Sequence, residues 1–415
     1  MKRLVAILLA LVMVISMVAC SAKSDTTTDA PASTDTKTEA PAETGSEETT
    51  EEQPAAAEGT VKLGLVTAVT GSNSLVGEEA QEGAQLAIDE INAAGGVNGQ
   101  MLELVVADEV DNLEMSVLAT QELLANDEIM GIIGSMYSTY CIAALPSVLE
   151  AQVPFMSMGS SSGVSKENNP YTWQDRPLDT AQGAVLADYV VNELGCKNPA
   201  IMHSTQSALQ SLADQTIAAF KEQGVEITDK NIFAFPDDES NYAPYIAQIM
   251  AGDYDCVIAM SNQAPSAVIC QQVESAGLTS DMMPLVGSTS FCSNVCISNA
   301  GSAANGWYSI SDWCPGGSND VAATFEENYR AYSGRAISDL AAVCVYDAVY
   351  IFAEAMKIAG TNTDREAINA AMEQVEYQGA ISYFKYNEDH SFATALTVTQ
   401  NVDGVPTAIK AVSYR

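Results

Sequence analysis

Hydrophobic positions in this chain alternate between short continuous runs and longer stretches with helical spacing. The runs at 61–67 and 101–107 are mostly apolar and predict buried strands. Gly95 and Gly96 mark a predicted helix end between them, where a left-handed residue is favoured. The stretch before these glycines repeats apolar or small residues at helical spacing, at Ala80, Gly83, Ala84, Ala87, Ile88 and Ile91. The pattern therefore predicts a strand–helix–strand unit.

The alternation continues along most of the chain and predicts an α/β fold with doubly wound parallel sheets. Because one open sheet seldom carries so many crossovers, two lobes are expected, with the first break near Leu178 and Asp179. Further strands are predicted at 130–134, 154–157, 200–203, 232–235, 256–260 and 285–287, and helices at 112–125, 138–151, 181–194, 209–223, 242–250, 265–276 and 340–359. A loop is predicted around 170–177, and terminal strands at 379–385, 393–400 and 408–413.

The first 59 residues do not fit this globular pattern. Lys2 and Arg3 precede an uncharged apolar run at 4–19, which suits a signal peptide better than a membrane span. Residues 21–60 are rich in Ser, Thr, Ala, Pro and acids, a composition that predicts a disordered tether. No later segment is apolar for long enough to cross a membrane.

Charge and cysteine content restrict the partners. The 415 residues carry a formal net charge of −37, which excludes nucleic acid as a plausible partner and means that an anionic ligand would need a local positive field. Most cysteines, Cys256 among them, lie in apolar patterns and are interpreted as buried small hydrophobes. Cys292, Cys296 and Cys314 lie close together in Ser-, Asn- and Gly-rich sequence. A disulfide, a zinc site or free thiols are all compatible with their spacing; free thiols are the simplest interpretation, and no metal is expected.

Two loops that follow predicted strands are candidates for ligand binding, because ligands collect beyond the carboxyl ends of strands in open parallel sheets. The first contains Tyr137 and Ser138 at a predicted helix start, where unpaired amides and the helix dipole attract a carboxylate. Ser138 could alternatively be only a helix N-cap. The second is GSSSG at 159–163, whose glycines let the backbone approach a ligand and whose hydroxyl groups can donate.

These segments resemble the leucine/isoleucine/valine-binding family of extracytoplasmic ligand-binding proteins, which serve ABC importers. The resemblance covers 61–415 and rests on EINAAGGVNG at 90–99, the loop at 134–138, GSSSG, LDTAQG at 178–183 and ESAGL at 274–278. It implies a periplasmic binding protein fold of type 1, with lobe 1 at 60–178 and 312–392, lobe 2 at 179–311 and 393–415, and a multi-strand hinge.

The N-terminal residues resemble those of bacterial lipoproteins. Residues 17–20 are similar to a lipobox, which implies a signal peptide at 1–19, lipidation of Cys20 and a membrane-anchored tether at 20–59, outside the cytoplasm. The alternative is an ordinary signal peptide followed by an incidental cysteine.

The family resemblance also implies roles for individual residues. Ser138, Gly159 and Ser161 match positions that hold the carboxylate of an amino acid. In amino-acid binders, second-lobe positions supply an aromatic ring that closes over the ligand and an acid that pairs with the ammonium group. The matching positions here are Ala208, Asn262 and Thr289, so the sequence departs from the branched-chain amino acid pattern at that point.

Four more side chains are candidates for ligand contact. Asp179 can take an ammonium group, Arg176 can take a second carboxylate, and Tyr137 and Trp173 can stack on a ring. The alternatives are that Asp179 caps the next helix, that Arg176 pairs on the surface, and that the aromatic residues only line the hinge.

The function expected from these features is capture of a small amino acid, amide or carboxylate by closure of two lobes, for delivery to an ABC permease without a cofactor. A lipoprotein that senses its ligand for a membrane receptor would share this fold.

A serine hydrolase is less favoured. GSSSG fits a nucleophile elbow centred on Ser161, with His203 or His390 as base, but 164–170 is expected to be a loop where the elbow needs a helix. We therefore expect a binding protein and not an enzyme.

Overall fold

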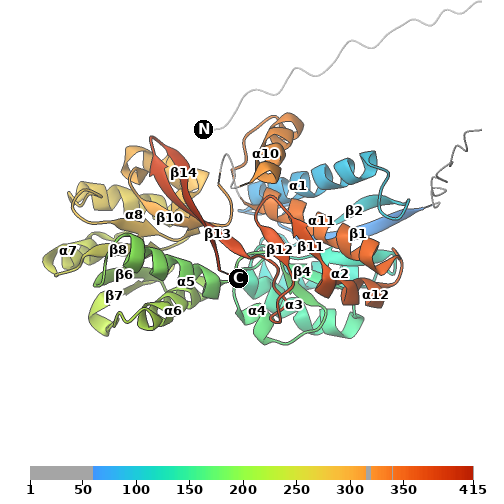
Figure 1. The fold of residues 1–415 in the computed structure, drawn as a ribbon, viewed down its shortest axis with the longest axis horizontal. Helices are drawn as coiled ribbons and strands as arrows, with labels where there is room; N and C mark the ends of the chain where they lie inside the picture. The colour runs from blue at the N-terminus through green and yellow to red at the C-terminus, as the bar shows by residue number, and fades with distance from the viewer. Residues whose placement is uncertain (1–58, 315–318, 339, 415) are drawn as a thin grey trace, which may run out of the picture. The chain divides into compact units, whose positions relative to one another are not determined.

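The computed structural model describes residues 59–314, 319–338 and 340–414. The predicted signal peptide, the lipidation site at Cys20 and the tether before residue 59 lie outside the described residues. Two α/β lobes make up the described part, each built on its own sheet (Figure 1). None of the helices in this part combines the length and the apolar character that crossing a bilayer requires.

The first lobe contains a five-stranded sheet in which every neighbouring pair is parallel. All five residues of β3 are buried, as expected for a parallel strand that is covered on both faces. In spatial order the strands are β2 (Met101–Asp108), β1 (Thr60–Thr67), β3 (Ile129–Ile133), β4 (Phe155–Ser157) and β5 (Thr172–Gln174).

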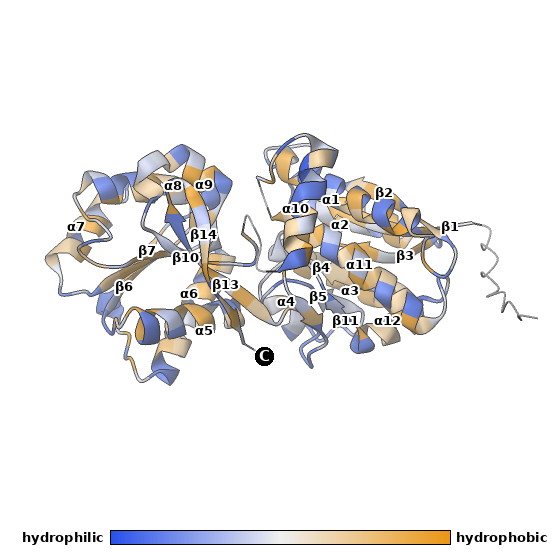
Figure 2. Cartoon of the chain, turned by 45° about the horizontal axis from the view of Figure 1, so that its top comes forward, coloured by the Kyte–Doolittle hydropathy of each residue, from blue (hydrophilic) through white to orange (hydrophobic). Residues whose placement is uncertain are grey.

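Helices from distant parts of the sequence cover the two faces of this sheet. One face packs against α1 (Ser74–Ala93), α11 (Ala341–Ala359) and α12 (Arg365–Ala371), and α10 (Asp320–Ser333) packs on α1 and α11. The other face packs against α2 (Leu113–Leu124), α3 (Ser138–Ala151) and the single turn α4 (Gly163–Lys166). Figure 2 shows the hydrophobic residues along β3 and α11 that form much of this core.

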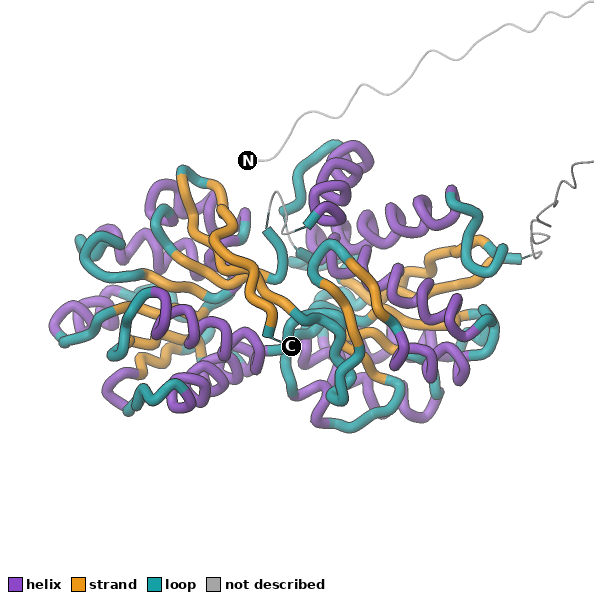
Figure 3. The backbone as a smooth tube through the Cα atoms, in the orientation of Figure 1, coloured by secondary structure: helices purple, strands orange, loops and turns teal. Residues whose placement is uncertain are grey.

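The second lobe contains a seven-stranded sheet. Strands β6 to β10 are parallel, whereas β13 and β14 form an antiparallel hairpin on the edge of the sheet, visible as the long paired strands in Figure 3. In spatial order the strands are β14 (Val405–Ser413), β13 (Ala395–Val402), β10 (Tyr308–Ser311), β9 (Leu285–Gly287), β8 (Cys256–Met260), β6 (Pro199–Ser204) and β7 (Ile232–Phe235).

Helices also cover both faces of the second sheet. One face packs against α5 (Asp179–Asp188), the π-helix η1 (Tyr189–Glu193) and α6 (Ser207–Glu222). The other packs against α7 (Ala243–Ala251), α8 (Gln263–Ser275) and α9 (Asn294–Ala300). Short 3₁₀ turns complete the described part: η2 (Asp229–Asn231), η3 (Thr289–Cys292), η4 (Gly301–Ala304) and η5 (Met372–Gln374).

The structure confirms the predicted α/β fold with two lobes and differs from the sequence-based expectation in several segments. The loop expected at 170–177 contains β5. The strand expected at 379–385 is shorter, because Gly379 and Ser382 form a turn, with a 2.9 Å bond from the Gly379 N–H to the Ser382 carbonyl oxygen. This turn joins β11 (Glu376–Gln378) to β12 (Tyr383–Lys385). Neither β10 nor α10 was predicted.

Candidate functional site

Three predicted residues of the first lobe meet where β3 and β4 end. Ser138 is the first residue of α3, and its Oγ accepts a hydrogen bond of 3.1 Å from the backbone N–H of Ser161. Gly159 lies against Ser138, since a Cβ added to Gly159 would come within 2.6 Å of the Ser138 Oγ and 2.7 Å of its Cα. The two strand-end loops are therefore in direct contact, and only a residue without a side chain fits between them.

The hydroxyl group of Ser138 does not cap its own helix. The N-cap of α3 is Tyr137, which makes no side-chain capping bond. Because the contact with Ser161 uses an oxygen lone pair of Ser138, the hydroxyl proton can still be donated to a ligand. α3 has 14 residues, so the first amides and the dipole of the helix supply positive potential at this point. The ring of Tyr137 packs on Tyr140, with centroids 5.1 Å apart.

Asp179 connects this loop to the second lobe, and two hydrogen bonds within the protein engage the carboxylate that is predicted to pair with a ligand ammonium group. Its side chain is 3% exposed, and its carboxylate accepts hydrogen bonds from the Ser162 N–H at 3.1 Å and from the Ser211 Oγ at 2.6 Å. It is also not the N-cap of α5, since Leu178 holds that position. The carboxylate thus connects the loop after β4 to α6.

The loop after β3 is supported by a buried acid, Glu109, which the sequence analysis did not predict as a site residue. Glu109 is 1% exposed and accepts hydrogen bonds from the hydroxyl groups of Ser116 at 2.8 Å and Ser135 at 3.0 Å. Burial raises the pKa of Glu109 from 4.5 to about 7, although both hydroxyl groups lower it. Glu109 supports Ser135, three residues before Ser138.

Trp173, which is predicted to stack on a ligand ring, packs in the core of the first lobe in this structure. The residue is 1% exposed, and its indole N–H donates to the Asn369 side chain at 2.9 Å. His390 stacks on the indole with centroids 4.4 Å apart, and Phe392 stacks on it at 5.6 Å. No face of the ring remains for a ligand in this conformation.

Arg176, which is predicted to contact a ligand carboxylate, is engaged in a buried ion pair, so the alternative of a surface pair is wrong. Its Nη2 lies 2.5 Å and its Nε 2.7 Å from Asp312 Oδ2, and the two side chains are 9% and 0% exposed. Arg176 follows β5 of the first sheet and Asp312 follows β10 of the second sheet, so the pair joins two of the segments that pass between the sheets.

Asp175, next to this pair, is fully buried. Neither of its carboxylate oxygens has a hydrogen-bond partner among the described residues. Burial raises the pKa of Asp175 well above its ordinary value, even though the neighbouring Arg176 lowers it.

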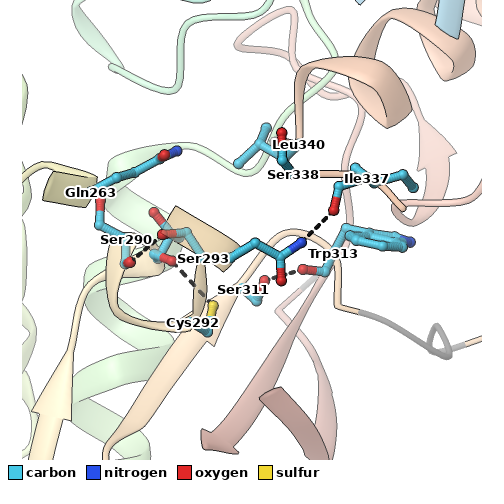
Figure 4. A pocket seen from close by; sticks show the side chains of 11 residues that line it. Gln263, Ser290, Cys292, Ser293, Ser311, Trp313, Ile337, Ser338 and Leu340 are labelled. Carbon is cyan, nitrogen blue, oxygen red and sulfur yellow. Dashed lines mark hydrogen bonds between the residues drawn. The ribbon is translucent and has the colours of Figure 1, made fainter. Parts of the chain in front are cut away.

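A cavity of about 60 Å³ lies beyond the ends of β9 and β10. Its volume exceeds what a single water molecule needs and falls well below the roughly 300 Å³ of a typical ligand pocket. Figure 4 places Gln263 and Ser290 on one side of it, and Ile337, Ser338 and Leu340 on the other. The complete lining is Gln263, Thr289, Ser290, Cys292, Ser293, Asn294, Ser311, Trp313, Ile337, Ser338 and Leu340.

Hydrogen bonds hold the two sides of this cavity together. The Asn294 side chain donates to the Ile337 carbonyl oxygen. The adjacent Ser338 donates through its N–H, at 2.9 Å, to Glu79 of α1, which is fully buried and also pairs with Arg335 at 3.0 Å. Ser338 is therefore held in place by α1, and the wall that it forms does not depend on a ligand.

The three predicted second-lobe residues lie at the ends of three different strands. Thr289 begins η3 after β9 and lines the cavity. Asn262 is the N-cap of α8 after β8, is exposed, and lies 3.4 Å from Asp237 Oδ1, while its neighbour Gln263 lines the cavity. Ala208 is the second residue of α6 after β6 and is half-buried.

The prediction of a loop at 164–170 is wrong for the first residues of that segment, because they belong to the helical turn α4. α4 begins at Gly163, one residue after Ser162 and two after Ser161. The helix that the nucleophile-elbow argument required is thus partly present. Both candidate bases contact other groups. His203 Nδ1 lies 3.0 Å from the Ser204 carbonyl oxygen, and His390 Nδ1 lies 3.1 Å from that of Thr172. The Ser161 Oγ accepts from the Gly163 N–H at 3.1 Å.

The cysteines that the sequence grouped together are not bonded to each other. Cys292, Cys296 and Cys314 are buried free thiols. Among the described residues, the one group of His, Cys, Asp and Glu side chains with the spacing of metal ligands contains Cys196, Asp255 and Cys256.

Sequence reasoning missed most of the cavity, although its own rule could have found part of it. Ser311 is the last residue of β10 and Trp313 lies just after it, but the sequence pattern did not predict this strand, so the rule that ligands gather beyond strand ends did not point to these residues. Ile337, Ser338 and Leu340 follow α10 rather than a strand, and local pattern gives no signal for them.

Two α/β lobes with polar loops at their strand ends define a bilobal ligand-binding protein. The sequence profile of the periplasmic binding protein family matches residues 60–405, and the chain belongs to that family.

Curated relatives are similar at low identity. Leu/Ile/Val-binding protein homolog 1 of Brucella suis is 26% identical over 346 residues, which cover 80% of this chain and 88% of the relative. An amino acid binding protein of Pseudomonas aeruginosa is 28% identical over 225 residues, which cover 54% of this chain and only 59% of the relative.

Solved structures share the fold. The branched-chain amino acid transporter substrate binding protein LivJ of Streptococcus pneumoniae, in complex with isoleucine, has a TM-score of 0.74 at 23% identity and covers 86% of this chain and 100% of its own. A solute binding protein of an ABC transporter from Rhodopseudomonas palustris, in complex with 3,4-dihydroxy benzoic acid, has a TM-score of 0.75 at 19% identity. The match covers 85% of this chain and 97% of that protein.

Proposed function

We propose that this chain is the substrate-binding lipoprotein of an ABC importer and that it captures a small solute with a carboxylate group. The observation that carries the proposal is the contact between Ser138 and the 159–161 loop. It places a hydroxyl group, loop amides and the start of a 14-residue helix at one point of an acidic protein. Such a site attracts a carboxylate without a fixed cation.

The second lobe supplies the other half of the clamp. We propose that lobe 1 comprises 60–178 and 312–392, that lobe 2 comprises 179–311 and 393–415, and that closure brings Thr289 and Asn262 over a ligand held at Ser138. A ligand favours the closed state only to the extent that it binds that state better, so it must contact both lobes. Thr289 lines the cavity of about 60 Å³, whereas Ser138 and the 159–161 loop do not, so the proposed site requires the lobes to move closer together.

The ligand class is proposed from the chemistry of the site together with the ligands of two solved structures that share the fold. Proteins of this fold bind isoleucine and 3,4-dihydroxy benzoic acid, two solutes that share only a carboxylate. With Asp179 engaged by Ser162 and Ser211, the structure offers no free acid at that position for an ammonium group. A carboxylate whose other end is polar or aromatic therefore suits the site better than a branched-chain amino acid.

A thermal-shift screen over amino acids, amides, aliphatic carboxylates and aromatic acids tests this proposal. A true ligand at a hundredfold excess over its Kd stabilises the protein by about 2.7 kcal/mol. Replacement of Ser138 by Ala should weaken binding of that ligand by roughly 1.5–3 kcal/mol, the usual contribution of a hydrogen bond to a charged group.

Ser147→Ala is the matched control, since Ser147 lies on the same helix and accepts a hydrogen bond from Gln121. This variant should keep the affinity of the unmodified protein. Stabilisation by amides or amines but by no carboxylate, or equal affinity of the Ser138 and Ser147 variants, would contradict the proposal.

A further inference from the structure

Two buried thiols meet where β6 and β8 begin, at the opposite end of the second sheet from the cavity. Cys256 is the first residue of β8 and is paired in register with Pro199 of β6, and Cys196 lies three residues before Pro199. The two sulfur atoms and a carboxylate oxygen of Asp255 all lie within 4.8 Å of one another. Cys196 is 4% exposed and Cys256 is 0% exposed.

The loop that carries Cys196 is held in place by hydrogen bonds that its backbone N–H groups donate. The Asp255 carboxylate accepts hydrogen bonds from the N–H groups of Lys197 at 2.6 Å and Asn198 at 2.9 Å. On its other side, the Cys196 N–H donates to the Val190 carbonyl oxygen at 3.0 Å. The closeness of the two sulfur atoms therefore follows from fixed main-chain positions.

A metal site would need more donors than these residues offer. Zinc takes four ligands, and the cluster supplies two sulfur atoms and one carboxylate. Both oxygens of that carboxylate already accept backbone hydrogen bonds. A disulfide needs only the two sulfur atoms, which must approach to about 2.05 Å by rotation of the side chains.

We propose that Cys196 and Cys256 form a dithiol that closes to a disulfide when the exported protein meets a disulfide donor of the glutathione class. The Cys196 thiolate attacks one sulfur of the donor disulfide, which breaks and leaves as a thiolate. The Cys256 thiolate then attacks the Cys196 sulfur and expels the second donor thiol. The two protein thiols are oxidised, the donor disulfide is reduced to two thiols, and the two protein protons end on them.

The bond would close a loop that contains β6, α6, β7 and α7, and it would lie at the strand starts, away from the loops that line the cavity. Disulfides persist in the extracytoplasmic compartments in which periplasmic binding proteins work. The proposal does not depend on the identity of the ligand, and failure of the ligand screen would leave it intact.

The test is peptide mapping of the full chain after incubation of the folded protein with excess glutathione disulfide. Remaining thiols are alkylated before the protein is unfolded and digested, and they are alkylated again afterwards. A Cys196–Cys256 peptide pair two hydrogens lighter than the sum of its parts is expected, and dithiothreitol should abolish it. Cys196→Ser should leave Cys256 alkylated, with no cross-link.

The unmodified protein alone decides the outcome, so a variant that fails to fold does not obscure it. Recovery of both cysteines in alkylated form, or a cross-link that joins either one to Cys292 or Cys314, would overturn the proposal. A second result would also overturn the proposal: the protein retains zinc after addition of zinc sulfate, the bound zinc blocks oxidation, and Cys196→Ser no longer retains zinc. That result would assign a metal site instead.

Discussion

At the scale of single residues, Gly159 decides whether the two strand-end loops of the first lobe can touch. A Cβ at this position would lie 2.6–2.9 Å from three atoms of Ser138, two of them backbone atoms. Such atoms cannot move aside as the end of a flexible side chain can. The hydroxyl and amide groups proposed to hold a carboxylate are therefore positioned by the absence of a side chain.

Replacement of Gly159 by Ala should abolish ligand binding and lower the free energy of unfolding by about 1–3 kcal/mol, the usual cost of overpacking. Gly163→Ala is the matched control, because its Cβ would lie 3.1 Å from the Ser161 Oγ, which can rotate away. Calorimetric titration and urea denaturation measure both effects. Equal losses in the two variants would show that the close contact is not the cause.

Glu109 makes stability dependent on pH. Burial raises its pKa from 4.5 to about 7, so the folded state binds the proton more tightly than the unfolded state. The contribution to stability is fully present below pH 4.5 and is lost as the pH rises through about 7. It amounts to about 3 kcal/mol across that window.

Glu109→Gln should therefore remove this dependence. The free energy of unfolding of this variant minus that of the unmodified protein should rise by about 3 kcal/mol between about pH 4 and pH 8. Glu114→Gln, at an exposed acid in the first turn of α2, is the control and should change little over the same range. Parallel pH profiles for the Glu109 variant and the unmodified protein would refute the assignment.

At the scale of secondary-structure elements, the packing of α1 on α11 assembles the first lobe from distant parts of the chain. Gly83 permits the approach, since a Cβ there would lie 2.0 Å from the Ala342 carbonyl oxygen. The sequence predicts both helices and places Gly83 on the apolar face of the first. It does not show that the two helices are neighbours.

Gly83→Ala should therefore destabilise the protein by at least about 1–3 kcal/mol, even though alanine is the better helix former. Asp89→Ala, at an exposed position of the same helix, should stay within about 0.5 kcal/mol. Chemical denaturation followed by circular dichroism distinguishes them. A stabilised Gly83 variant would mean that the two helices are farther apart than described.

At the scale of the whole molecule, the Arg176–Asp312 pair joins two of the segments that pass between the two sheets. Both side chains are almost fully buried, so loss of one partner leaves an uncompensated charge in a region of low dielectric. Because Ser311 and Trp313 on either side of Asp312 line the cavity, the pair also fixes part of the site.

Asp312→Ala should lower the free energy of unfolding by about 3–5 kcal/mol. The double variant Arg176→Met with Asp312→Leu should recover most of this loss, because it removes both charges. Lys410→Ala, which breaks an exposed pair with Glu193, should cost less than about 1 kcal/mol and serves as the control. A double variant no more stable than Asp312→Ala would argue against the buried charge as the cause.

The sequence by itself determined the alternation of strands and helices, because periodic burial is a local property that each segment displays. The two-lobed α/β fold could therefore be predicted from the sequence. The loops of Ser138 and Gly159 were predicted as candidates for ligand binding, because ligands gather beyond strand ends. Several boundaries were predicted to the residue, as at β7, β8 and α3.

Only the tertiary structure decided which polar groups are engaged and which remain available. Asp179, Arg176 and Trp173 resembled ligand contacts in sequence, but distant residues at Ser211, Asp312 and Asn369 occupy them. Cys196 meets Cys256 for the same reason, through strand register and not through spacing. Pairing of charges, thiols and hydroxyl groups depends on distances of a few ångströms between segments far apart in the chain, and those distances exist only after packing.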